Sequence, residues 1–166
     1  MYRTIADFLT DWTEESSGTQ KILDALSDGS LSQKVTQEGR TLAHLAWHLT
    51  LTVGEMMRDA GLPISPLDEK APVPEKAGEI QEAYRRDAAA LSTHLPSKWT
   101  DAMLEDEISM YGQTWKRHQV LSALIMHQAH HRGQMTVVMR QAGLRVPGIY
   151  GPSKEEWGAY NMPAPW

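Results

Sequence analysis

Cysteine is absent from the 166 residues of the chain. Disulfides, thiolate metal ligands and a cysteine nucleophile are therefore excluded, and any metal site must use nitrogen and oxygen ligands. Clustered lysine and arginine are also absent, and the formal net charge is −5. Because phosphate binding needs clustered basic residues, we expect no nucleic acid partner.

No apolar run approaches the roughly 18 residues that a membrane-spanning helix needs. The opening segment, Met1 to Thr4, lacks the apolar region of a secretion signal. We therefore expect a cytoplasmic protein with no membrane partner. Hydrophobic residues make up 41% of the chain and charged residues 22%, which is typical of a folded protein. Residues 1–166 form one domain on this interpretation, large enough to bury a core.

Apolar residues recur at helical spacing in four segments, which predicts an all-α four-helix bundle. The first helix runs from Ile5 to about Asp28, with Thr19 on its inner stripe and Gly18 facing outward. The other three are expected over 41–60, 75–93 and 114–141. Thr41 is placed to cap the second helix, Pro96 to stop the third, and Thr114 to cap the fourth.

Residues 62–74 contain four prolines and predict a stiff, extended linker. Thirteen such residues can cover about 40 Å, so this long crossover lets the second and third helices run parallel. Residues 107–115 predict a small hairpin before the fourth helix. An irregular C-terminal tail follows Gly143. Its aromatic residues favour packing on the bundle or in a homodimer interface, and they include Trp157, Tyr160 and Trp166.

The fourth helix carries His127 and His131 four residues apart, so both point to one face and can grip one metal ion. With His127 at zero, the apolar stripe centres near +70°, His131 lies at about +40° and His130 at about −60°. His131 therefore faces the core, and His130 lies at the rim. Gln128 occupies the position of the zincin glutamate and cannot act as its general base, so a zincin protease is excluded.

The second helix supplies a third imidazole, because His48 lies at the edge of its apolar stripe while His44 points further into solvent. Three neutral histidines with an open fourth position are typical of a catalytic zinc site. With no carboxylate ligand the site keeps its full positive charge, which favours a bound hydroxide or thiolate. Imidazole suits several metals, and we expect a divalent transition metal, zinc first and nickel second.

Four further residues are candidates for hydrogen bonds to the ligands or for substrate contacts: Gln134, His130, Glu55 and Arg132. Each has a plainer interpretation. Arg132 is favoured as a structural ion-pair partner, and Glu55 as part of a solvated helix face. His94 and His118 are interpreted as surface residues near helix ends.

The chain resembles the DinB/YfiT superfamily of four-helix metalloproteins along essentially its whole length. The resemblance rests on the segment Arg40–His48, on His127-x-x-x-His131-Arg132-Gly133-Gln134, and on Val146-Pro147 with Tyr150-Gly151-Pro152-Ser153. It implies that His48, His127 and His131 are metal ligands and that the protein is a homodimer. The superfamily includes thiol-dependent transferases and isomerases. The isomerase branch often has Glu where this chain has His127, so that reaction is not carried over.

Two functions are compatible with these features. The first is a metal-dependent thiol transferase or hydrolase, in which the three-His site activates a small-molecule thiol or water. The alternative is a non-catalytic, stress-associated binding module with a structural or vestigial metal site, because no second catalytic group stands out.

Overall fold

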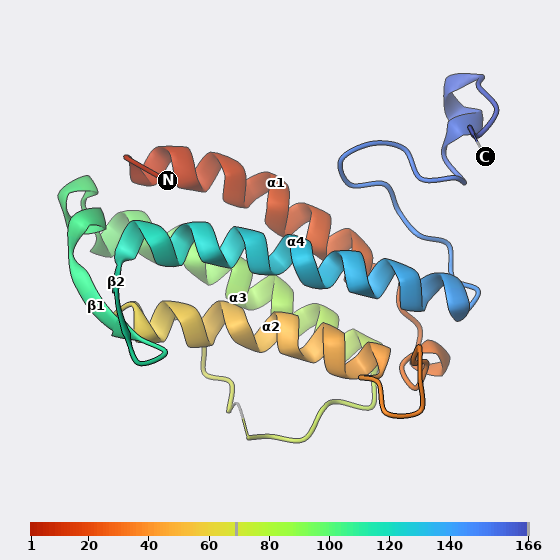
Figure 1. Cartoon of the computed structure of the whole chain (residues 1–166), viewed down its shortest axis with the longest axis horizontal. Helices are drawn as coiled ribbons and strands as arrows, with labels where there is room; N and C mark the ends of the chain where they lie inside the picture. Colours follow the sequence, from red (N-terminus) through yellow and green to blue (C-terminus); the bar gives the residue numbers. More distant parts are fainter. Residues whose placement is uncertain (69, 166) are drawn as a thin grey trace.

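A computed structural model of the chain describes residues 1–68 and 70–165. Four long helices form a bundle, flanked by a two-stranded hairpin and a C-terminal tail (Figure 1). The helices are α1 (Ile5–Asp24), α2 (Leu42–Asp59), α3 (Ala77–Lys98) and α4 (Arg117–Gln141). The shorter elements are η1 (Asp28–Ser30), η2 (Asp101–Glu105), β1 (Glu107–Met110), β2 (Gln113–Lys116) and η3 (Trp157–Tyr160).

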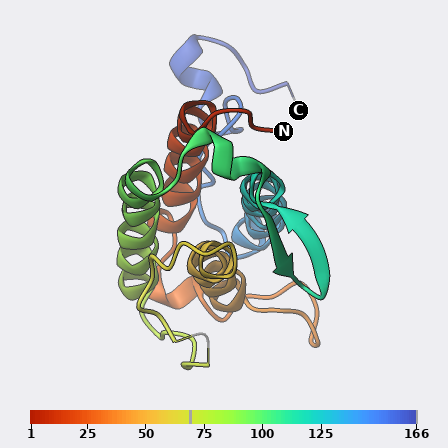
Figure 2. The ribbon, with the colours of Figure 1, turned by 90° about the vertical axis from the view of Figure 1, so that its left-hand side faces the viewer.

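Helices α1 and α4 run in one direction and α2 and α3 run in the other, as Figure 1 shows. Seen from the end in Figure 2, the four helices surround a common core, and α2 and α4 are neighbours. The parallel pair α2 and α3 is joined by the predicted long crossover. This segment packs on α2 at Gly54, where an added Cβ would lie 2.4 Å from Cβ of Ser65. The predicted all-α fold and its crossover are confirmed.

Local sequence signals fix most helix ends. The Thr41 hydroxyl accepts a hydrogen bond from the backbone N–H of His44 and so caps α2. Gly61 and Gly143 follow α2 and α4 with φ of 87° and 72°, the left-handed conformation that closes a helix.

Pro96 does not stop α3, contrary to expectation. The helix continues to Lys98, and the backbone N–H of Trp99 still donates to the carbonyl of Leu95 at 2.9 Å. A proline removes only its own N–H from the helical ladder. Leu95 and Trp99 are buried, and their packing holds the last turn in place.

The fourth helix begins at Arg117 rather than Thr114, because the hairpin takes the preceding residues. Thr114 pairs with Ser109 across the two strands, so it does not cap the helix. Tyr111 and Gly112 form the turn with φ of 51° and 75°, the two left-handed positions of a tight hairpin. Strand pairing therefore overrides the capping preference of Thr114.

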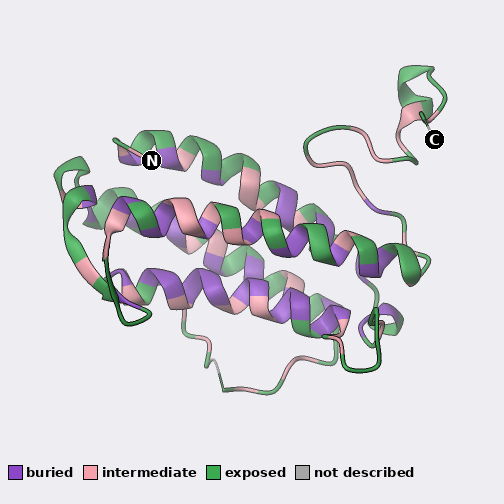
Figure 3. Ribbon diagram, viewed as in Figure 1, coloured by how far each residue is buried: buried purple, intermediate pink, exposed green. Residues whose placement is uncertain are grey.

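The first part of the tail packs closely on the bundle. Val146 is buried, and Ile149 lies so close to α1 that a Cβ on Gly18 would be 2.8 Å from its Cγ2. Gly18 is therefore buried against the tail. The prediction that it faces solvent is wrong. Further along, Glu155 forms an ion pair with Arg140 of α4, and η3 projects from the bundle (Figures 1 and 3). Trp166 lies outside the described residues.

In the part of the chain that the structure describes, no helix combines the length and the apolar character needed to cross a membrane.

Candidate metal centre

Three imidazoles converge between the neighbouring helices α2 and α4. Nε2 of His127 lies 3.2 Å from Nε2 of His48 and 3.1 Å from Nε2 of His131. Ligand nitrogens of the three residues all lie within 4.8 Å of one another. The structure thus brings together the three histidines that the sequence singled out. In each of them the ring atom that takes part in these contacts is Nε2.

Hydrogen bonds at the far side of two rings set their orientation. Nδ1 of His131 is 2.7 Å from Oε1 of Gln134, and Nδ1 of His127 is 3.4 Å from Oγ1 of Thr52. The Thr52 hydroxyl in turn donates to the carbonyl of Leu49. An imidazole that donates from Nδ1 keeps a lone pair on Nε2. Both contacts therefore favour the tautomer whose Nε2 can bind a cation.

Burial favours the neutral form of all three rings. Desolvation, followed by the interaction with His131, lowers the pKa of His48 and of His127 to about 4. Burial also lowers the pKa of His131, against the opposing effect of the hydrogen bond that His131 donates to Gln134. The positive charge of Arg40 also lowers the pKa of all three histidines.

This arrangement fits a divalent cation. With bonds of about 2.0–2.1 Å, two imidazole nitrogens on a tetrahedral zinc lie roughly 3.3 Å apart. The two Nε2 separations, 3.2 and 3.1 Å, are close to that value. Neutral rings also supply the lone pairs that metal binding requires.

The remaining histidines lie elsewhere. His44 and His94 are exposed, as predicted. His130 is exposed at the rim, with its ring centroid 4.8 Å from that of His131. His118 is buried, with 4% of its surface exposed, so its assignment as a surface residue is wrong. It lies in the first turn of α4, and η2 packs against that helix. The apolar periodicity of one helix does not predict that a neighbouring element such as η2 will bury a residue on it.

The other three candidates lie in different places. Gln134 and Arg132 are on different faces of α4, and Glu55 is on α2. Gln134 contacts both His131 and His130, whose Nε2 is 3.1 Å from the Gln134 side-chain nitrogen. Arg132 is buried and instead forms an ion pair with Glu15. Its guanidinium also donates to the carbonyl of Glu15 at 2.8 Å and to Oγ1 of Thr19 at 3.0 Å. Glu55 is half-buried on α2 and falls outside the three-His group.

Gln128 has a structural role that periodicity alone does not show. Its Oε1 accepts from the hydroxyls of Thr19 on α1 and Tyr84 on α3, at 3.0 and 3.1 Å. Its side-chain nitrogen donates to the carbonyl of Leu49 on α2 at 3.2 Å. One fully buried side chain therefore joins all four helices, directly beside His127.

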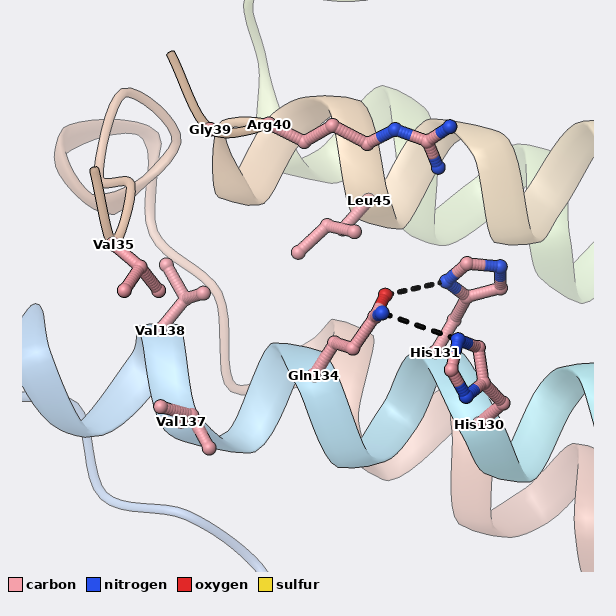
Figure 4. A pocket seen from close by; sticks show the side chains of 9 residues that line it. All are labelled: Val35, Gly39, Arg40, Leu45, His130, His131, Gln134, Val137 and Val138. Atoms are coloured by element: carbon pink, nitrogen blue, oxygen red, sulfur yellow. Dashed lines mark hydrogen bonds between the residues drawn. The ribbon is translucent and has the colours of Figure 1, made fainter. Parts of the chain in front are cut away.

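A pocket of about 610 Å³ opens beside the three-His group, between α4 and the loop that precedes α2. Arg40 and Leu45 lie on one side, and His130, His131 and Gln134 on the other (Figure 4). The remaining lining residues are Val35, Gly39, Val137 and Val138. Sequence reasoning missed Arg40, because its place depends on how the preceding loop folds back.

Comparisons with known proteins agree with this architecture. The sequence model of the DinB family matches residues 1–163. The chain is 43% identical over 165 residues to the uncharacterized protein YrdA of Bacillus subtilis, covering 99% of each. A crystal structure of a DinB-like protein from Bacillus cereus has a TM-score of 0.87 at 43% identity, covering 90% of this chain and 100% of that one. The DinB-like protein YjoA of B. subtilis shares the fold at 16% identity, with a TM-score of 0.67 over 86% and 97% of the two chains. The chain belongs to the DinB family.

Proposed function

We propose that His48, His127 and His131 bind one divalent transition metal ion, and that the site activates a small-molecule thiol or water for transfer or hydrolysis. The convergence of three Nε2 atoms between α2 and α4 carries the proposal. Zinc is the metal that we expect first and nickel the second, since both accept imidazole ligands. A bound divalent cation would lower the pKa of a thiol or water molecule beside it.

The chain's own residues would hold and orient this site. Gln134 and Thr52 fix the rings of His131 and His127 through their Nδ1 atoms. Hydrogen bonds of this kind select the ligating tautomer. The adjoining pocket gives a small molecule access to the group, because His131 and Gln134 line it. A thiol or water bound at the His131 end of the pocket would lie beside a substrate that occupies the rest of the pocket.

Elemental analysis tests the metal-binding part of the proposal. The purified protein should contain close to one equivalent of metal per chain. Each of His48→Ala, His127→Ala and His131→Ala should lower that value well below one, because two imidazoles bind a divalent ion much more weakly than three. His44→Ala and His130→Ala are matched controls and should retain the metal. Full retention of metal in His48→Ala would refute the ligand set.

A non-catalytic metal-binding module is the second candidate. It is favoured by the lining of the pocket, which contains no acidic residue that could act as a general base. An exchangeable thiol or water on the metal-loaded protein supports the enzyme. A fourth protein ligand that closes the site supports the module, and X-ray absorption spectroscopy of the metal distinguishes the two.

A further inference from the structure

We propose that Arg40 makes the pocket beside the three-His group selective for amphipathic small molecules that carry a carboxylate or a phosphate. In this arrangement the anionic group pairs with Arg40 at the His131 end of the pocket, beside the three histidines, and the apolar part extends toward Val35, Val137 and Val138. The inference rests on the proposed function for the identity of the reactive end. The selectivity of the pocket is a separate property of this chain and can be tested separately.

Arg40 is a cationic side chain without an anionic partner of its own. It is exposed, and no carboxylate in residues 1–68 or 70–165 lies within ion-pair distance of its guanidinium. Figure 4 shows the side chain extending beside Leu45, with the guanidinium directed toward the end of the pocket where His131 lies.

The electrostatics of the pocket favour an anion. None of its lining residues is acidic, and three neutral imidazoles would leave the charge of a divalent cation uncompensated. Arg40 adds a second positive centre to the same space. Clefts lined by charge of one sign concentrate ligands of the opposite sign. A guanidinium also matches the geometry of a carboxylate or phosphate, with two parallel hydrogen bonds.

The remaining walls are apolar. Val35 and Val137 are more than half exposed, at 55% and 54%, and both line the pocket with Leu45 and Val138. An aliphatic segment placed between them would remove their side chains from water. Only Gln134 and the two histidines on α4 interrupt this lining with neutral polar groups. The ligand that fits best is therefore anionic at the end beside Arg40 and His131, with an apolar tail toward the valines.

A matched pair of thiols tests the selectivity at the metal-loaded site. The probes are 4-mercaptodecanoate and 4-mercaptodecan-1-ol, which carry a hexyl tail beyond the thiol and differ in the carboxylate alone. Binding to the cobalt-substituted protein is measured by titrating the thiolate-to-metal absorption band. The acid should bind at least about tenfold more tightly than the alcohol, the scale of one charge-assisted hydrogen bond.

Three variants assign the effect to Arg40. Arg40→Gln should abolish the preference for the acid, so that the two thiols bind with similar affinity. Arg40→Lys should restore part of it, because lysine keeps the charge but not the paired geometry. Lys98→Gln removes the same charge at the opposite end of the bundle and should keep the full preference. Equal binding of acid and alcohol to the unaltered protein, or an unchanged preference in Arg40→Gln, would overturn the inference.

A second measurement keeps the test independent of the metal. Isothermal titration calorimetry on metal-free protein compares octanoate and octyl phosphate with octanol. Tighter binding of either anion, lost in Arg40→Gln, supports the inference, and the stronger of the two identifies the anionic group. Absence of any metal in the protein would refute the proposed function, whereas equal binding of all three probes would refute the role of Arg40.

Discussion

Nδ1 of His131 lies 2.7 Å from Oε1 of Gln134, three residues along the same helix. Neighbours at this spacing lie on one helix face, so α4 itself supplies both a candidate ligand and the group that orients it. The amide oxygen of Gln134 can only accept, which requires His131 to carry its proton on Nδ1. Nε2 is then free to face His127, 3.1 Å away.

The first prediction concerns this contact. Gln134→Leu should weaken metal binding by about 10-fold to 100-fold, because the ring of His131 loses its orienting hydrogen bond. Competition with a chromogenic chelator measures the affinity. Gln134→Glu keeps an acceptor at the same place and should preserve tight binding. Val137→Ala, one turn further along the same face, is a control that alters the helix surface without touching the ring. Unchanged affinity in Gln134→Leu would show that the contact does not orient His131.

The second prediction separates the fold from the metal. Removing the metal with a chelator should leave most of the far-ultraviolet circular dichroism signal intact. The reason is that the core packs the apolar faces of all four helices, and Gln128 already joins them through hydrogen bonds. Loss of the helical signal together with the metal would indicate a structural site instead.

Gln128 gives the third prediction. Gln128→Leu should lower the free energy of unfolding by about 2–4 kcal/mol, because Thr19, Tyr84 and the carbonyl of Leu49 would lose a buried partner. Urea denaturation measures the change. Gln141→Leu, at an exposed position of α4, should change stability by less than about 0.5 kcal/mol. A small effect of Gln128→Leu would mean that water or a rearranged side chain satisfies the three groups.

The sequence predicted the helices well, because each has a continuous apolar stripe over four or more turns. It also placed His48, His127 and His131 together, since helical phase fixes which way each side chain points. It failed at His118, Gly18 and Thr114. At those positions a neighbour from elsewhere in the chain decides the outcome: η2, the tail and strand β1 respectively.

The pocket was also beyond sequence reasoning, and for the same reason. Arg40 belongs to an irregular loop whose path has no periodic signature, and the residues it faces are some ninety positions away on α4. Helical phase predicts the direction of a side chain on a regular element. It does not predict which loop residue lies opposite.

The fourth prediction concerns pH. The pKa of His48 and of His127 is about 4 in the folded chain, compared with 6.5 for an ordinary histidine. Between these values the unfolded chain binds more protons, so the stability of the metal-free protein should fall as the pH is lowered from about 6.5 to about 4. Arg40 and His130 face the same group and add to the effect on His127.

Urea denaturation across this pH range measures the dependence. A variant with both His48→Asn and His127→Asn should lose stability less steeply as the pH falls, whereas His44→Asn should follow the unaltered protein. Added zinc should oppose the loss, because it binds the folded, neutral imidazoles. A double variant with the same slope as the unaltered protein would assign the pH dependence to other groups.

The last prediction is that the protein is a homodimer. Met126 and Val137 expose 65% and 54% of their surface on one side of α4, and Tyr160 and Met162 expose 62% and 53% in the projecting tail. Large exposed apolar side chains of this kind are typical of interfaces, and a two-fold dimer is the commonest closed assembly. Light scattering at micromolar concentration should give the mass of two chains.

Deleting residues 157–166 should weaken the dimer more than it weakens metal binding, because the three histidines lie on α2 and α4. Met126→Lys should weaken it as well if α4 takes part, with Lys98→Gln as the control. A mass of one chain that persists as the concentration rises would refute the dimer.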